Sequence, residues 1–285
     1  MSISDSSTRS VQIVGGSQNV TFTAPNTFTV KLPASGFRTG KDVCAMKSLT
    51  VYYSWPNISA AKGNNAFSYV WNGTTFPVVL ADGIWNFSDV LDYLQQVMVQ
   101  NGHYLVDAAG RRVYYIKFVA NPVLYSLSVT ITPLPSSLPA DWTNPAGVVL
   151  SGNTPQLIIP AGMTELTGFS AGTYPAAVQT ALYQVNSTMI PQITNVTAMN
   201  VTSNIVASSG LSLFPNVLAN FVVPNDQISG SLVQIQPVNM DWVPIHKANT
   251  FSEISVSIVD QAMRPVVLRD PAGFVCILNI RRVRD

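Results

Sequence analysis

The chain has 285 residues, of which 47% are hydrophobic and only 10% are Asp, Glu, Lys or Arg. The charged fraction is well below the roughly 25% of an average soluble domain. A disordered chain combines low hydrophobicity with high net charge, so disorder is excluded. Fifteen basic and 14 acidic residues leave a formal charge of +1, which excludes a strongly basic nucleic-acid binder. No apolar run approaches the roughly 20 residues that span a bilayer, so we expect no membrane span. These exclusions predict a globular chain whose surface is built from Ser, Thr, Asn and Gln or is covered by other protein.

Most of the chain has the pattern of β-strands. Runs rich in Val, Ile, Thr and aromatic residues are separated by Pro, Gly and Asn, which is typical of an all-β sandwich or barrel. In the run FSEISVSIVD, the apolar residues can share one face with a single slip near Glu253. The predicted strands lie in residues 19–32, 43–55, 113–120, 124–132, 231–237, 251–259 and 273–281.

One amphipathic helix interrupts the predicted strands. Asn86 or Ser88 can cap its N-terminus, and Asn101 with Gly102 ends it, because both residue types tolerate a left-handed conformation. A second stretch, residues 174–184, is predicted to be helical or irregular. The apolar positions of the first helix recur at helical spacing and are Val90, Leu91, Leu94, Val97 and Met98.

No sharp domain boundary is visible in the sequence. The Pro-rich residues 133–145 (PLPSSLPADWTNP) are predicted to form a long loop or the start of an insertion, and residues 207–216 form a second irregular zone. Neither has the composition of a flexible linker. We therefore expect a single domain over residues 1–285, with a loop insertion around 133–216.

The search for catalytic and metal sites predicts none. His103 is interpreted as a surface-loop or helix-end residue, and His246 as a strand residue. Asp82 and Asp260 are expected in turns, where an Asp side chain bonds its own backbone. No nucleophile elbow, phosphate-binding loop, zinc spacing or calcium loop is present, so we expect neither enzymatic activity nor a cofactor. The remaining acids include Asp89 and Asp92, read as solvated charges at a helix start.

The two cysteines lie in apolar runs that read as strands. Cys44 is in VCAM and Cys276 is in FVCIL. Buried free thiols are the preferred interpretation, and a single disulfide bridge is the alternative.

Arginine is concentrated at the C-terminal end of the chain. Residues 264–285 contain five arginines and two aspartates, a local charge of +3. Arg281, Arg282 and Arg284 fall in the last five residues. They are either a solvated chain end or an electrostatic contact, to acidic neighbouring subunits or to nucleic-acid phosphate.

The order of two long segments is similar to a known family. Residues 77–102 (PVVLADGIWNFSDVLDYLQQVMVQNG) read as a strand, a turn and a short helix, and residues 251–282 (FSEISVSIVDQAMRPVVLRDPAGFVCILNIRR) as strands around an Asp-Gln turn. This pairing resembles the penton or minor capsid proteins of double-stranded DNA viruses that include Polinton-like viruses, virophages and adenoviruses. Residues 158–175 (IIPAGMTELTGFSAGTYP) have a similar character.

The resemblance implies a single jelly-roll β-sandwich, with two facing antiparallel sheets, one short helix and long loops. It also implies a homopentamer at the vertices of an icosahedral virion and contacts with the neighbouring major capsid protein. In such a particle, the C-terminal arginines could make non-specific contact with the packaged genome. A capsid protein of this kind is expected in the virion, after assembly inside the host cell. Residues 1–16 lack the apolar core of a secretory signal. The chain has no Arg-Gly-Asp sequence, so receptor binding of that type has no support.

Other functions stay open at this point. Another single jelly-roll capsid protein is a close alternative. A β-sandwich glycan-binding or attachment protein is a second, with Trp142 and Trp242 as candidates to line a sugar site. A cupin-like enzyme is a third, although two histidines in unrelated settings argue against it. The low charge content favours subunit contacts, since interface cores are depleted in Lys, Glu and Asp.

Overall fold

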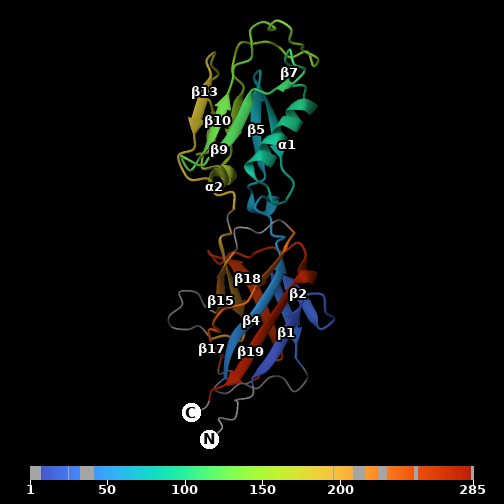
Figure 1. Ribbon diagram of the computed structural model, residues 1–285, viewed down its shortest axis with the longest axis vertical. Helices are drawn as coiled ribbons and strands as arrows, with labels where there is room; N and C mark the ends of the chain where they lie inside the picture. The colour runs from blue at the N-terminus through green and yellow to red at the C-terminus, as the bar shows by residue number, and fades with distance from the viewer. Residues whose placement is uncertain are drawn as a thin grey trace. The chain divides into compact units, whose positions relative to one another are not determined.

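The computed structural model describes residues 8–24, 26–32, 42–194, 196–207, 216–223, 230–246 and 250–283. The chain divides into two compact units. The first unit contains Met1–Trp55 and Val196–Asp285, and the second, here named the inserted unit, contains Pro56–Asn195. In Figure 1 the blue and red ends of the chain build the first unit, and the cyan to yellow middle builds the inserted unit.

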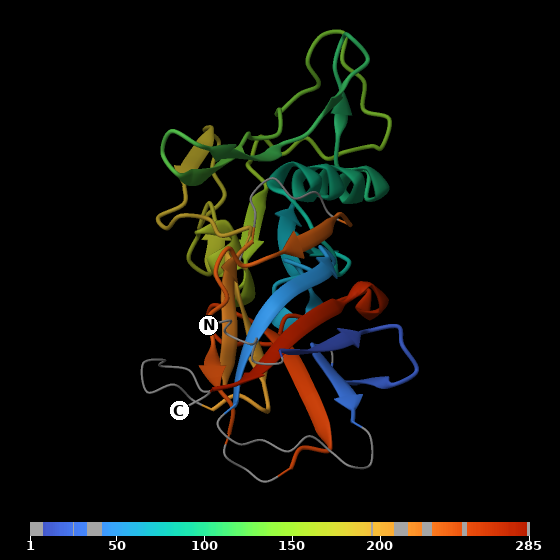
Figure 2. The same cartoon turned by 60° about the horizontal axis from the view of Figure 1, so that its bottom comes forward.

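Two antiparallel sheets form the first unit. One sheet has the strand order β1-β19-β4-β16, with β17 also paired to β4, and the other has the order β15-β14-β18-β3-β2. Blue β4 and red β19 lie side by side in Figure 2, although they come from opposite ends of the chain. The strands are β1 (Arg9–Val14), β2 (Val20–Ala24), β3 (Thr27–Lys31), β4 (Asp42–Tyr52), β14 (Ala198–Ser203), β15 (Val217–Val222), β16 (Leu232–Ile235), β17 (Val243–Pro244), β18 (Glu253–Asp260) and β19 (Val275–Arg282), and a short 3-10 turn, η3, spans Pro271–Gly273.

The path of the chain through these sheets is that of a jelly roll. Its eight strands, in chain order, are β1, β3, β4, β14, β15, β16, β18 and β19. Numbered one to eight, they have the order 1-8-3-6 in one sheet and 5-4-7-2 in the other, which is the double Greek key of this fold. The predicted all-β jelly-roll class is therefore confirmed. Strand β2 extends the second sheet by pairing with β3.

The inner faces of the two sheets share one apolar core. Ile254, Val256 and Ile258 on β18 are fully buried, which confirms the alternation predicted from the sequence. Leu49 on β4 and Leu278 on β19 belong to the same core. Because successive side chains of a strand point to opposite faces, the residues between these apolar positions face away from the core.

The inserted unit has its own core and its own sheets. Its strand orders are β12-β11-β5-β6, β13-β10-β9 and the short pair β7-β8. Of residues 174–184, predicted to be helical or irregular, residues 175–182 are irregular, whereas Tyr174, Tyr183 and Gln184 belong to two short strands. The elements are η1 (Ala60–Lys62), β5 (Ala66–Trp71), β6 (Thr74–Val79), α1 (Phe87–Gln100), β7 (Leu105–Val106), β8 (Arg112–Val113), β9 (Ile116–Asn121), β10 (Ser126–Ile131), β11 (Gln156–Ile159), η2 (Ala161–Met163), α2 (Thr164–Thr167), β12 (Gly172–Tyr174) and β13 (Tyr183–Asn186).

The extent of the insertion differs from the sequence prediction. One domain over residues 1–285 with a loop insertion around 133–216 was expected, whereas a compact unit lies between β4 and β14 and begins at Pro56. Its two ends meet through Asn57, whose Nδ2 donates to the Ile193 carbonyl at 2.7 Å and to the Trp85 carbonyl at 2.6 Å. The boundary of the unit is thus formed by a contact between residues far apart in the chain, and no linker-like composition marks it in the sequence.

Helix α1 confirms the predicted caps. The Asn86 side chain accepts from the Asp89 N–H, and the Asp89 carboxylate accepts from the Asn86 N–H, which is a capping box. Asp89, read from the sequence as a solvated charge, therefore caps the helix. Val90, Leu94 and Met98 are buried along one side of the helix, as their spacing predicts.

Candidate interaction surfaces

The outer face of the second sheet of the jelly roll carries hydroxyl and amide side chains. Between β3 and β18, Thr29 Oγ1 lies 2.8 Å from Ser255 Oγ, and Thr27 Oγ1 lies 2.8 Å from Ser257 Oγ. Antiparallel pairing places these residues opposite one another. The surface, named the hydroxyl face, consists of Thr27, Thr29, Asn200, Thr202, Asn220, Ser255 and Ser257. Asn220 is exposed, Thr29 and Asn200 are already buried within the chain, and the other four are half-buried.

Amide groups continue the hydroxyl face across β14 and β15. Asn220 Nδ2 donates to Asn200 Oδ1 at 2.7 Å, and Asn200 Nδ2 donates to the Asp260 carbonyl at 3.1 Å. Because these groups bond one another, covering the face with protein leaves few of them unsatisfied. The charged residues of β3, β14, β15 and β18 are Lys31, Glu253 and Asp260, all at strand ends.

A second candidate surface is the turn between β9 and β10 in the inserted unit. Val123, Leu124 and Tyr125, named the apolar turn, are 82%, 57% and 72% exposed. The Leu124 N–H donates to Asn121 Oδ1 at 3.1 Å, so a polar side chain holds the turn. Tyr125 has a φ of 49°, a left-handed value that Gly or Asn adopts at lower cost. Three adjacent apolar side chains that the turn itself does not bury favour contact with another molecule.

The sequence around the apolar turn has few charges. Residues 118–225 contain only Asp141 and Glu165 as charged residues. Two further exposed apolar residues, Met189 and Ile190, follow β13, which pairs with β10 directly after the turn. Exposed apolar side chains in charge-depleted surroundings are typical of the centre of a protein interface.

The arginines at the end of β19 have partners within the first unit. Arg281 Cζ lies 4.0 Å from the centroid of the Trp242 ring. Arg282 Nε lies 3.7 Å from Asp42 Oδ1, and the Arg282 side chain is 71% exposed. Arg284 lies outside the described residues. Arg281 and Arg282 are consecutive residues at the end of β19, and each has an intramolecular partner that the sequence pattern did not indicate.

His103 is not the surface residue that the sequence suggested, although it does follow a helix end. It is 8% exposed, and its Nδ1 lies 2.8 Å from the Tyr69 hydroxyl oxygen. Its ring stacks on Trp71 with centroids 4.6 Å apart. Gly102, at a φ of 73°, turns the chain back toward the sheet, and this buries the ring. His246 is half-buried, and its N–H donates to the Ile205 carbonyl at 2.9 Å.

The two cysteines are buried and free, as predicted. Burial raises the pKa of the Cys44 thiol to about 12 and raises the pKa of Cys276 as well. Neither thiol is therefore ionised at neutral pH, and neither is prepared to act as a nucleophile or metal ligand.

Within the described ranges, no three His, Cys, Asp or Glu side chains gather in an arrangement that could hold a metal ion. No helix of the described part of the chain is long and apolar enough to cross a membrane.

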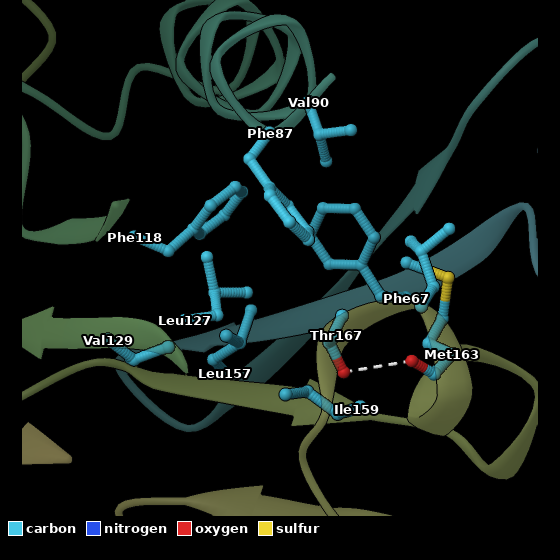
Figure 3. Close-up of a pocket in the computed structure, with 11 residues that line it drawn as sticks. Phe67, Phe87, Val90, Phe118, Leu127, Val129, Leu157, Ile159, Met163 and Thr167 are labelled. Atoms are coloured by element: carbon cyan, nitrogen blue, oxygen red, sulfur yellow. Dashed lines mark hydrogen bonds between the residues drawn. The ribbon is translucent and has the colours of Figure 1, made fainter. Parts of the chain in front are cut away.

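The core of the inserted unit contains a small apolar cavity of about 30 Å³. The rings of Phe67 and Phe87 lie beside it in Figure 3, between α1 and the sheets. The hydroxyl of Thr167 also lines it but donates to the Met163 carbonyl at 2.8 Å. A void of this size without a free polar partner is a packing defect in the core rather than a ligand site.

Comparisons with known proteins give structural matches only. No family model matches the chain, and no curated protein matches it. The solved structures similar to it include the mavirus penton protein, at 9% identity and a TM-score of 0.40, over 97% of this chain and 98% of that one. They also include a chain of the Sputnik virophage structure, at 11% identity and a TM-score of 0.39, over 96% and 98% of the two chains.

Proposed function

We propose that this chain is a structural protein of a virus capsid, a penton that forms homopentamers at the vertices of an icosahedral virion. It contacts the neighbouring major capsid protein, resides in the virion and is assembled inside the host cell. Its role is architectural, without a cofactor or enzymatic activity.

The observation that carries this proposal is the hydroxyl face of the jelly roll. Jelly rolls occur in capsid proteins, lectins and cupins, so the fold alone does not select among these functions. A hydroxyl face whose groups bond across strands, with charge only at the strand ends, loses little on desolvation when another subunit covers it.

The apolar turn supports contacts with a different neighbour. It belongs to the inserted unit and carries three exposed apolar side chains in a charge-poor part of the chain. We assign it to a contact between the inserted unit and neighbouring capsid protein. Arg282, with its exposed side chain, stays the better placed of the two described terminal arginines for an acidic subunit or genome phosphate.

Glycan binding is the alternative function, and its two candidate residues weaken it. Trp142 is half-buried and packs against the core of the inserted unit. The Trp242 ring has the Arg281 guanidinium over one face, which occupies the surface that a sugar ring would stack on.

Oligomeric state tests the proposal most directly. Mass photometry and negative-stain electron microscopy of the purified protein should show pentamers, whose population rises with concentration. A stable monomer at tens of micromolar would contradict the proposal, and binding to a glycan array by that monomer would favour the alternative.

A charged substitution on the hydroxyl face tests the surface itself. Thr202→Lys places an ammonium group in the middle of the face and should reduce the pentamer population at least tenfold, because the interface would have to bury an unpaired charge. Gln96→Lys, on the exposed side of α1, is the matched control and should assemble normally. Circular dichroism establishes that both variants fold. Equal assembly of the two variants would exclude the hydroxyl face as the subunit contact.

A further inference from the structure

His103 occupies a fixed place at the junction of α1 and the β5–β6 hairpin. The His103 N–H donates to the Met98 carbonyl at 2.7 Å, and the Gly102 N–H donates to the Val99 carbonyl at 3.0 Å. These bonds close the C-terminus of the helix and turn the chain. The imidazole is thereby directed onto the side chains of β5 and β6, so that it joins the end of the helix to the hairpin.

Two hydrogen bonds connect Asn101, Tyr69 and the His103 ring. Asn101 Nδ2 donates to the Tyr69 hydroxyl oxygen at 3.1 Å, and that hydroxyl lies 2.8 Å from His103 Nδ1. We assign the hydroxyl proton of Tyr69 to this contact, so that His103 Nδ1 accepts it and the neutral imidazole carries its own proton on Nε2.

The other contacts of the ring are aromatic. Trp71 stacks on it at 4.6 Å, and Phe76 meets it edge-on at 4.5 Å. Tyr115 lies behind Trp71, with ring centroids 5.9 Å apart. Burial raises the pKa values of Tyr69 and Tyr115 to about 12, so both stay uncharged below neutral pH. The described side chains around His103 therefore offer no negative charge to an imidazolium ion.

We propose that His103 is an acid-sensitive latch of the inserted unit: the neutral ring holds the end of α1 on the β5–β6 hairpin, and protonation releases it. A proton on Nδ1 removes the acceptor that the Tyr69 hydroxyl uses and places a charge among aromatic rings. The face of Trp71 and the C-terminus of α1 both attract a cation. Burial acts in the opposite direction and lowers the pKa of His103 from 6.5 to about 4.

The direction of the pH effect follows from these two values. The unfolded or released chain takes up a proton below about pH 6.5, whereas the latched ring does so only near pH 4. The latch is therefore fully stabilising above pH 6.5, and its contribution is lost as the pH falls from 6.5 to 4. The latch does not depend on the proposed capsid function.

Hydrogen–deuterium exchange of the full chain tests the latch. Protection factors, corrected for the intrinsic pH dependence of exchange, should fall on the order of 50-fold between pH 7 and pH 4.5 in peptides covering β5, β6 and the end of α1. Peptides covering β18 and β19 serve as the internal reference and should keep their protection. A parallel loss in both sets would mean general acid unfolding and would overturn the proposal.

Substitutions assign the effect to one ring. His103→Phe keeps an aromatic side chain that cannot titrate, so its protection should no longer depend on pH in this window. His246→Gln removes the other histidine of the chain and should retain the wild-type profile. A wild-type pH profile in H103F would overturn the proposal.

Titration of the wild-type protein keeps the test independent of variant folding. The imidazole carbon-bound proton of His103 can be followed by NMR between pH 7.5 and 4, with His246 as the second signal. The His103 signal should stay that of a neutral ring until the pH approaches 4. A midpoint near 6.5 would overturn the latch.

Discussion

Burial shifts the pKa values of the cysteines of the first unit and of His103 in the inserted unit in opposite directions. In the first unit, burial raises the pKa values of the Cys44 and Cys276 thiols, whose protonated form is neutral. In the inserted unit, burial lowers the pKa of His103, whose deprotonated form is neutral. Desolvation favours the neutral form in every case. The comparison shows that one physical effect suppresses the reactive thiolate of the buried cysteines and makes the buried histidine sensitive to mild acid.

Both units also contain the same turn, which makes the comparison closer. Asp107–Arg111 (DAAGR) and Asp260–Arg264 (DQAMR) each join an aspartate to the arginine four residues later. In each, one carboxylate oxygen accepts from the arginine N–H, at 2.9 Å and 2.8 Å, and the other accepts from the arginine Nε, at 2.9 Å and 2.7 Å. The prediction that Asp260 lies in a turn, with its side chain hydrogen-bonded to the backbone of that turn, is confirmed.

The largest effects on stability should come from substitutions that create a cavity in either core. Leu94 and Leu278 are both fully buried, one in each core. Truncation to alanine should destabilise the affected unit by about 2–5 kcal/mol. The two cysteines lie in the first unit, so the rate of thiol labelling under native conditions reports its opening. Leu278→Ala should accelerate labelling strongly, and Leu94→Ala should accelerate it little.

Hydrogen exchange in α1 is the complementary readout for these two variants. Leu94→Ala should remove protection from α1, whereas Leu278→Ala should leave it in place. Equal acceleration of labelling by both variants would show that the two units open together, and the comparison between them would fail.

The aspartates of the two turns should give the next largest effects. Asp260 is 4% exposed and accepts from the N–H groups of Ala262 and Arg264 and from the Arg264 side chain, so Asp260→Ala should cost about 2 kcal/mol in urea unfolding. Asp107→Ala should cost less, because Arg111 is 79% exposed and solvent replaces its contacts. A larger loss for Asp107→Ala would reverse this ranking.

Acid should act on the Asp107 turn in a window of its own. The pKa of Asp107 is lowered, mainly because the carboxylate accepts from the Arg111 N–H. Its contribution to stability is therefore present above the unfolded value near 3.8 and is lost as the pH falls below it. Exchange in β7 and β8 should thus respond at lower pH than exchange around His103, and a response of both in the same window would contradict this order.

The smallest effects concern the left-handed residue of each turn, Gly110 at a φ of 77° and Met263 at a φ of 62°. No atom lies within 4 Å of a Cβ built on Gly110, so Gly110→Ala should cost about 1 kcal/mol through backbone strain alone. Met263→Gly should change stability by less than about 1 kcal/mol, in the stabilising direction, since relief of strain is partly offset by the greater freedom of the unfolded chain. Thermal unfolding of both variants distinguishes these outcomes.

The sequence predicted local structure well and the candidate surfaces only in part. The low charge content indicated a surface for subunit contacts, but not which strands would carry it. The hydroxyl face depends on register, which sets Thr29 opposite Ser255 across 226 residues of chain. The arginines of β19 were visible as a charge run, whereas the position of Trp242 against Arg281 depends on the fold.

By itself, the sequence determined seven strand regions, the ends of α1 and the turn at Asp260, because each depends on side chains and backbone groups within a few residues of one another. It did not indicate β1, β14 or β15 of the jelly roll. The low charge content of the sequence corresponds in the structure to charge-poor strands and an exposed apolar turn. Only the tertiary structure decided where the inserted unit begins, since Asn57 reaches Ile193 across 136 residues. It also decided that His103 is buried, because Tyr69 and Trp71 come from a hairpin some 30 residues away. Local rules specify elements, and the burial that sets a pKa or exposes a surface arises only when those elements pack.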